Sequence, residues 1–334
     1  MPKVARLLRG RSAENFLNDV DGVENGGEFR LLLDEFLDEW GQRNESFNEL
    51  AFQTWREDPR FVVSTVAAYL DVSDDRSPTA MNRRVAEARE AITAEAEERL
   101  ADPEKIDAFR LVQRRAQQRP VLIEDHNYSI DQRAFSTTRV PCLAIGKALR
   151  DRGAINETED VFFLHRDELS EAAEHPGLPW GSIVEERKQE WERWTNQLPP
   201  SLIGEGEIQI DPMRAQMQGL LDIGDPKDGE IPGLAASGGQ VQGTARLILT
   251  LQDAHRFKPG DILATYSTAP PWTPLFAIAA AVVTDSGGPL SHCAIVAREY
   301  GIPAVVVTKV ATARIKDGTL LTVDGSEGVV TFEE

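Results

Sequence analysis

Hydrophobic residues recur at helical spacing through the first two thirds of the chain. Between Phe29 and Trp40 they stand at positions 29, 32, 33, 36, 37 and 40. This i, i+3, i+4, i+7 pattern places them along one side of an α-helix. Comparable patterns predict further helices over residues 61–70, 78–100, 103–118, 129–152 and 182–197. Asp102-Pro103 suits the start of a helix, and Pro141 should kink or break one.

The pattern changes after the prolines at 199 and 200. Residues 201–239 are rich in Gly, Pro and Asp and show little periodicity, which indicates a hinge-bearing linker. Beyond it, helical patterns at 272–279 and 292–300 interrupt short β-rich runs at 241–251, 262–265, 280–284, 304–307, 320–323 and 329–332. We predict an α+β protein of two domains: a mostly helical domain over residues 1–198, a linker over 199–239, and a compact α/β domain over 240–334. The apolar run 161–164 predicts one short strand within the helical domain.

The charge is strongly acidic and unevenly distributed. The 334 residues include 36 Lys and Arg against 55 Asp and Glu, a formal net charge of −19. Residues 233–334 hold only 7 basic and 9 acidic side chains, so most of the excess lies upstream. Phosphate-backbone binding draws on clustered positive charge, so the sequence argues against a nucleic-acid partner.

The sequence also argues against a membrane partner and a disulfide framework. Its longest apolar stretch, 275–283, is far shorter than the roughly 20 residues of a membrane span. The first eleven residues lack the apolar core of a signal peptide. Cys142 and Cys293 lie far apart, without the paired spacing of a zinc site. We therefore expect a cytoplasmic protein with no metal-ligand motif.

The most informative chemistry lies in residues 284–299, T-D-S-G-G-P-L-S-H-C-A-I-V-A-R-E. A predicted strand leads into Gly287 and Gly288, which allow the backbone to approach a phosphate closely. A helix is predicted to begin at His292, where its N-terminus favours an anion. A neutral imidazole is a nucleophile at physiological pH. His292 is therefore the candidate phosphoryl carrier, and Arg298 a candidate phosphate contact.

This segment closely resembles the phosphohistidine swivelling domain of the phosphoenolpyruvate-utilising enzymes, which include phosphoenolpyruvate synthase, pyruvate phosphate dikinase and rifampicin phosphotransferase. The pattern T-x-x-G-G-x-x-S-H-x-A-x-x-A-R-E-x-G-x-P-A is matched without a gap over residues 284–304. The resemblance implies that His292 carries the phosphate, that Thr284 and Ser291 hydrogen-bond around it, and that Arg298 steadies it. The alternative is a capping histidine among structural glycines.

Weaker resemblances extend upstream to about residue 29. W-T-P-L-F at 272–276 is similar to the rifampicin phosphotransferase branch, although A-P-P precedes it where that branch usually has Asp-Pro. G-Q-R at 41–43 with W-R-E-D-P at 55–59 resembles the branch's G-H-R and W-R-x-D-P, with Gln42 in place of the histidine. E-D-H-N-Y-S-I-D-Q-R at 124–133 resembles a stretch of its acceptor-binding helical domain.

The resemblance also implies a partner. Relatives charge the histidine with an ATP-grasp module, and no phosphate-cradling glycine-rich loop lies near the start of this sequence. We expect a separate ATP-grasp subunit that binds ATP and Mg²⁺. Two-component phenylphosphate and methylphenyl phosphate synthases are split in this way. The resemblance to them implies transfer through a phosphohistidine intermediate to a phenolic or alcohol hydroxyl, giving an aryl phosphate, AMP and phosphate.

The helical region offers candidates for the acceptor side. A phenol with a pKa of about 10 needs a base, for which His126 and Asp131 are candidates, although a structural role for His126 is equally compatible. The candidate phosphate contacts are Arg133 and Arg139, which would not share one face of a straight helix. The candidate substrate contacts are Arg43, Trp55, Tyr128 and Phe135, with Phe47, Phe52 and Phe162 as further aromatic residues; core packing is the alternative for the aromatics.

Two other functions stay open at this point. The first is a phosphocarrier or regulatory module whose phosphohistidine passes its phosphate only to a protein. The second keeps the enzyme but makes the acceptor an antibiotic hydroxyl, as in the rifampicin enzymes.

Overall fold

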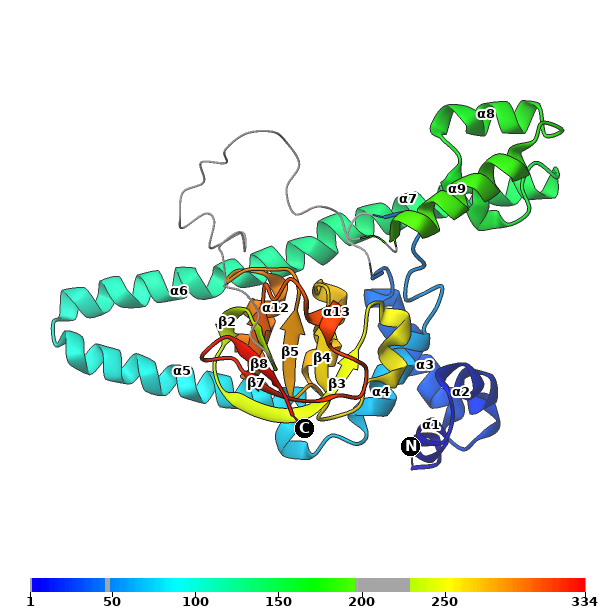
Figure 1. The fold of residues 1–334 in the computed structure, drawn as a ribbon. Coiled ribbons are helices and arrows are strands. Elements are labelled where there is room, and N and C mark those ends of the chain that lie inside the picture. The colour runs from blue at the N-terminus through cyan, green and yellow to red at the C-terminus, as the bar shows by residue number, and fades with distance from the viewer. Residues whose placement is uncertain (1, 46–48, 196, 198–228, 334) are drawn as a thin grey trace, which may run out of the picture. The chain divides into compact units, whose positions relative to one another are not determined.

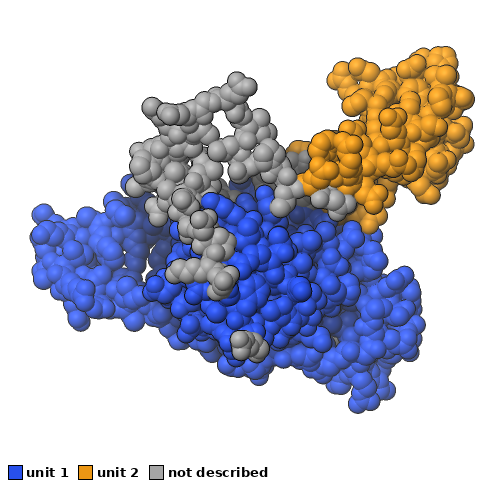
Figure 2. Space-filling view, in the orientation of Figure 1, with its two compact units in different colours: residues 1–45, 54–127, 210–334 blue, residues 46–53, 128–209 orange. Residues whose placement is uncertain are grey.

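The computed structural model describes residues 2–45, 49–195, 197 and 229–333 (Figure 1). The chain divides into two compact units (Figure 2). Unit 1 comprises residues 1–45, 54–127 and 210–334, and unit 2 comprises residues 46–53 and 128–209. Helices and one mixed sheet make up the described residues, which confirms the predicted α+β class. Most of the predicted linker lies outside the described residues.

The helices that the hydrophobic pattern predicts in unit 1 are confirmed. Ser77 caps one of them by accepting a hydrogen bond from the Ala80 N–H at 3.2 Å, and Asp102 caps another through the Glu104 N–H at 3.0 Å. A proline occupies the first turn in both. Two helices that the pattern did not predict, α1 (Pro2–Arg9) and α2 (Ala13–Asp19), precede the predicted α3 (Gly26–Trp40), α4 (Arg60–Tyr69), α5 (Pro78–Leu100) and α6 (Pro103–His126).

An eight-stranded sheet forms the C-terminal part of unit 1. Its order is β1-β8-β7-β3-β4-β5-β6-β2; β3 to β6 run parallel, and the remaining neighbours pair antiparallel. The strands are β1 (Glu230–Pro232), β2 (Leu234–Ser237), β3 (Gln240–Leu247), β4 (Ile262–Thr265), β5 (Ala281–Thr284), β6 (Ala304–Val306), β7 (Leu320–Asp324) and β8 (Val329–Phe332).

The sheet curls back on itself, because its two end strands, β1 and β2, are separated in sequence by Gly233 alone. A Cβ on Gly233 would lie 2.5 Å from Val305 Cγ1, so only glycine fits this approach. Residues 230–232 and 234–237, which lie inside the predicted linker, form strands. The Gly and Pro residues around these short strands made the segment resemble a linker in the sequence. In the structure Ile231 is fully buried, as expected of a strand in the core.

Two hydrophobic clusters sandwich the parallel strands. Alternate residues of β4 and β5, such as Ile262 and Val283, face an inner cluster, while Leu263 and Val282 face an outer one. The outer cluster includes residues of two short helices, α11 (Thr273–Phe276) and α12 (His292–Tyr300). A further helix, α13 (Ala311–Arg314), contributes Ala311 to the inner cluster. Two 3₁₀ turns, Leu251–Arg256 and Pro270–Trp272, complete this domain.

The N-terminal helices and the sheet domain pack together within unit 1. Met81 is buried in the outer cluster. The Tyr69 hydroxyl donates to the Pro274 carbonyl at 2.9 Å, and the Glu45 carboxylate accepts from the Leu251 N–H at 2.8 Å. Because of such contacts, the compact units do not follow the predicted boundary at residue 198.

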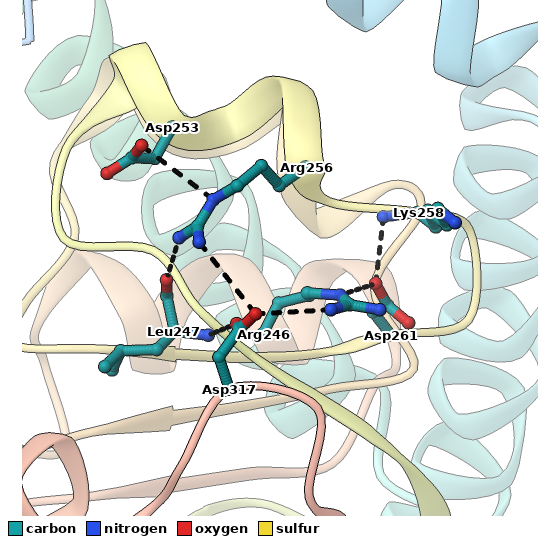
Figure 3. Close-up of polar contacts among 7 residues, drawn as sticks. All are labelled: Arg246, Leu247, Asp253, Arg256, Lys258, Asp261 and Asp317. Carbon is teal, nitrogen blue, oxygen red and sulfur yellow. Dashed lines mark hydrogen bonds and ion pairs between the residues drawn. The ribbon is translucent and has the colours of Figure 1, made fainter.

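A polar network ties together the loops at one end of β3 and β4 (Figure 3). Arg246 donates to Asp261 at 3.0 Å and to Asp317 at 3.3 Å. The Asp317 carboxylate also accepts from the Leu247 N–H at 2.9 Å. Arg256 donates to the Leu247 carbonyl at 2.7 Å. These bonds fix the loop that precedes β7 against the parallel strands.

Unit 2 is helical. A π-helical segment (Asn127–Gln132) begins where α6 ends and leads into α7 (Arg133–Asp151), which continues through Pro141 without ending. The predicted strand at 161–164 is wrong, because a 3₁₀ helix forms at Thr158–Phe163. The Asp160 carboxylate caps it by accepting from the backbone N–H groups of Asn156 and Glu157 at 3.0 and 2.9 Å. Two helices follow, α8 (Arg166–Glu174) and α9 (Trp180–Thr195).

None of the helices in the described part of the chain is long and apolar enough to cross a membrane. Among the same residues, no three His, Cys, Asp or Glu side chains are arranged to hold a metal ion.

Candidate active site

His292 is the first residue of α12 and follows the loop that leaves β5. Ser291 is the N-cap, with an extended backbone (φ −68°, ψ 158°), and its hydroxyl accepts from the Ala294 N–H at 3.4 Å. The predicted order of strand, glycine pair and helix is therefore confirmed. The arrangement places His292 at the N-terminus of this helix, where the helix dipole favours an anion.

The loop before the helix depends on glycine at one position. Gly287 has a φ of 135°, and a Cβ there would lie 3.0 Å from Ser291 Oγ. Ser291 in turn donates its N–H to the Gly288 carbonyl at 3.0 Å. The exposed Arg298 donates from its guanidinium to the Pro289 carbonyl, so it lies against the same loop as the glycine pair.

A buried carboxylate anchors the other end of this loop. Asp285 is 5% exposed and accepts from the Thr308 hydroxyl at 2.9 Å and the Thr312 N–H at 3.1 Å. Val307 and Lys309 both have a φ of 61°, and this left-handed conformation is strained above all for the β-branched Val307. Asp285 was not among the predicted site residues, although an acidic residue directly after a buried apolar strand is a signal that could have identified it.

Both nitrogens of the His292 imidazole have hydroxyl partners. Thr268 Oγ1 lies 3.0 Å from Nδ1, and Thr273 Oγ1 lies 3.2 Å from Nε2. The edge-to-face Phe276 ring is centred 5.9 Å away. Burial lowers the imidazole pKa from its ordinary value to about 4. The side chain is therefore neutral at physiological pH, which is the nucleophilic form.

Neither threonine partner was predicted as a site residue. Thr273 lies in the W-T-P-L-F segment, but a separation of 19 positions from the histidine conceals the contact. Thr284, which was predicted, is fully buried and donates its hydroxyl to the Ser286 carbonyl at 2.8 Å. Cys293 lies beside Thr284 and Thr268, and burial raises the pKa of its thiol to about 12. It is thus an unreactive neighbour of the histidine.

Two predicted acceptor residues of unit 1 lie in an aromatic cluster. The Arg43 guanidinium lies 5.2 Å from the centre of the Trp40 ring and 5.8 Å from that of Trp55. Trp55 is 8% exposed and belongs to the N-terminal hydrophobic core. The backbone N–H of Trp55 donates to the Arg43 carbonyl at 2.8 Å, which positions the arginine backbone beside the tryptophan. His126 is exposed at the end of α6.

In unit 2, the two predicted arginines have different surroundings. Arg139 is 2% exposed, donates to the Leu50 carbonyl and to Glu159, both at 2.5 Å, and lies 4.6 Å from the centre of the Phe162 ring. Arg133 is exposed. The structure therefore does not bring these two together. The other predicted residues of this unit are Tyr128, which is buried, and Asp131 and Phe135, which are half-buried.

Gln132, which sequence reasoning missed, is the most unusual polar residue of unit 2. It closes the π-helical segment and is 2% exposed. Among the described residues, neither its amide nitrogen nor its amide oxygen has a hydrogen-bond partner. Buried polar groups are almost always paired, and π-helical turns recur at functional sites. Gln132 is therefore a candidate ligand contact.

An aromatic groove of about 490 Å³ lies elsewhere in unit 2. The Arg187 guanidinium supports one wall by donating to the Phe163 carbonyl at 2.7 Å and to Glu168 at 2.6 Å. This contact lowers the pKa of Glu168 to about 2. The groove is lined by Phe162, Phe163, Leu164, His165, Arg187, Glu190, Trp191, Trp194 and Thr195. Of these, sequence reasoning had singled out only Phe162.

Comparisons with known proteins agree with this geometry. Residues 257–328 match the mobile domain of PEP-utilising enzymes, and residues 1–120 match the fourth domain of rifampicin phosphotransferase. A chondramide synthase of Chondromyces crocatus is 36% identical over 99% of the chain and 9% of its own length. An uncharacterised phosphotransferase of Bacillus subtilis is 32% identical over 99% of the chain and 40% of its own length.

A rifampicin phosphotransferase of Streptomyces sviceus is 30% identical over 98% of the chain and 37% of its own length. The chain thus spans less than half of each of these relatives. The two domain matches lie on the two halves of unit 1, and the mobile-domain match contains His292 and its loop. On these grounds the chain belongs to the family of PEP-utilising enzymes.

Proposed function

We propose that this chain is the histidine-carrying part of a phosphotransferase, in which His292 receives a phosphoryl group and passes it to a hydroxyl acceptor. The observation that carries the proposal is a neutral imidazole at the N-terminus of α12, beside a glycine loop. In the first half-reaction, an imidazole nitrogen forms a bond to phosphorus while the bond from phosphorus to the donor's oxygen breaks. In the second, the acceptor oxygen attacks that phosphorus, the N–P bond breaks, and the hydroxyl proton goes to a base.

The proposed phosphoryl donor is ATP with Mg²⁺, bound on an ATP-grasp module outside residues 1–334. The N-terminal region described here consists of helices, without a strand and glycine-rich loop to cradle a triphosphate. The module would release AMP and inorganic phosphate for each phosphoryl group delivered to the acceptor. Mg²⁺ would supply charge neutralisation on the polyphosphate.

The proposed acceptor is a phenol or a related alcohol. The aromatic groove offers apolar walls to a ring. Gln132 does not line this groove and is a separate candidate contact, because its amide offers a donor and an acceptor without partners among the described residues. Asp131 and His126 remain the candidate bases, and Arg43 a candidate for lowering the phenol pKa.

Reconstitution with a separately expressed ATP-grasp protein tests this proposal. The chain and the partner are incubated with ATP, Mg²⁺ and a phenol, and AMP, aryl phosphate and the adduct at residue 292 are measured. We expect AMP and aryl phosphate only when both proteins are present, with an acid-labile phosphohistidine at His292. Absence of that adduct in a mixture that forms product would overturn the mechanism. His255→Ala is the matched control, because His255 is exposed and outside this site.

A rifamycin-type hydroxyl is the second candidate acceptor, favoured by the 30% identity with a rifampicin phosphotransferase over 98% of the chain. Offering the reconstituted enzyme equal concentrations of a simple phenol and a rifamycin discriminates the two. Preferential formation of the rifamycin phosphate would replace the phenol proposal.

A further inference from the structure

The hydrogen bonds at His292 determine where its single imidazole proton lies. Thr273 Oγ1 lies 3.2 Å from Nε2 and donates its hydroxyl proton to the Pro270 carbonyl at 2.8 Å. A hydroxyl has one proton. Because Thr273 has given that proton to the carbonyl, it faces Nε2 with lone pairs alone. The contact is therefore a hydrogen bond only if Nε2 carries a proton.

The other nitrogen must then accept. Burial keeps the imidazole neutral at physiological pH, and a neutral imidazole has one N–H. With that proton on Nε2, Nδ1 has a lone pair, and the Thr268 hydroxyl at 3.0 Å is its donor. The two threonines thus have opposite roles.

We infer that Thr273 is a positioning residue that fixes His292 in the Nε2–H tautomer and withholds Nε2 from attack on phosphorus. In this pose Nε2 is protonated and the Nδ1 lone pair is covered by Thr268. Accepting a phosphoryl group at Nε2 requires that its proton move to Nδ1, which then donates to Thr268 Oγ1. Thr273 opposes that exchange. The consequence for transfer rests on the proposed function, whereas the tautomer itself does not.

The backbone supports this role for Thr273. The residue begins α11, and Pro270 lies three residues earlier in the preceding 3₁₀ turn, so the carbonyl is held at a fixed position by local structure. The Trp272 side chain is 5% exposed and anchors the same turn in the outer cluster. The direction of the Thr273 hydroxyl is therefore fixed by the local backbone and does not depend on the imidazole.

Nitrogen-15 NMR of the full chain, labelled at histidine, tests the tautomer without any partner or donor. We expect a protonated Nε2 and an unprotonated Nδ1 for His292, assigned by comparison with His292→Gln. Thr273→Val removes the acceptor, so the ratio of Nε2–H to Nδ1–H should fall about fivefold, the equivalent of one ordinary hydrogen bond. Thr273→Ser should restore it, and Thr268→Val should leave the proton on Nε2.

A second measurement uses phosphoramidate, a small donor that phosphorylates imidazole and releases ammonia as its P–N bond breaks. Thr273→Val should be phosphorylated at Nε2 about fivefold faster than the native chain, and Thr273→Ser at the native rate. A native spectrum with the proton on Nδ1, or a Thr273→Val spectrum identical to the native one, overturns the inference. Failure of the partner reconstitution would leave these spectra unaffected, so the two proposals fail separately.

Discussion

The polar groups around His292 and the amide of Gln132 differ in whether they have hydrogen-bond partners. At His292, two threonine hydroxyls face the two ring nitrogens, and the neighbouring Asp285 carboxylate accepts from Thr308 and Thr312. At Gln132, neither end of a buried amide has a partner among the described residues. A paired group is held in one orientation, whereas an unpaired one costs free energy until something binds it.

The difference suggests a division of labour between the two units. The histidine domain keeps the His292 imidazole neutral and hydrogen-bonded, as suits the carrier role proposed for it. The π-helical segment keeps an amide without a partner among the described residues, as suits a group that receives a ligand. Each of the predictions below tests one side of this contrast.

Replacing the carrier should have the largest effect. His292→Ala removes the nucleophile, so we expect phosphoryl transfer by the reconstituted enzyme to fall at least about 1,000-fold. Because the His292 side chain is only half-buried at the first position of α12, circular dichroism should show an intact fold. His255→Ala should transfer at the native rate. Substantial product formation by His292→Ala would contradict the assignment of the carrier.

Disturbing the glycine loop should have the next largest effect. Gly287→Ala places a Cβ 3.0 Å from Ser291 Oγ at a φ of 135°, so the helix cap must shift, and we expect transfer to fall about 10- to 100-fold. Gly318→Ala is the matched control, since it also has a positive φ (85°) but meets no atom within 4 Å. It should lose about 1 kcal/mol of stability and keep its transfer rate. Equal loss of activity in both would attribute the effect to backbone strain alone.

Acid should destabilise the histidine domain through its carrier. The native pKa of His292 is about 4, below its ordinary value. As the pH falls through the unfolded value of about 6.5 toward 4, the unfolded state binds the proton that the native state refuses, so stability is lost. We expect up to about 3 kcal/mol of this loss to disappear in His292→Gln. Denaturant titrations at several pH values measure it, and identical pH profiles for native protein and variant would refute the burial argument.

Removing the Gln132 amide should have the smallest effect on the free energy of unfolding. Unlike the preceding changes, it should raise stability. Gln132→Leu replaces a buried polar group that has no partner among the described residues, so we expect the free energy of unfolding to rise by about 1 kcal/mol. Transfer to the acceptor should fall while charging of His292 stays unchanged. Gln189→Leu is the control, because Gln189 is exposed and donates to Glu185 at 3.2 Å. If Gln132→Leu lowers stability, the amide has a structural partner and the contrast between the two regions is lost.

The sequence was informative where chemistry and local structure coincide. Residues 281–300 show their strand, glycine turn and capped helix directly, because each element depends on neighbouring residues. Thr273 and Asp285 were not recognised, since their roles arise from contacts made only after the parallel strands assemble. The run 161–164 is apolar enough for a strand, but the Asp160 cap and the contact of Val161 with α7 favour a helical turn. Sequence periodicity carries no signal for such long-range partners.

The strand order of the histidine domain has a consequence for its behaviour in concentrated solution. Sheets usually have two edges at which an extended segment from another molecule can add through backbone hydrogen bonds. Here the two outermost strands run into each other through Gly233, so residues 229–333 bring their edges together instead of presenting them on opposite sides. A domain built in this way offers little template for intermolecular strand addition, whichever surface it leaves uncovered.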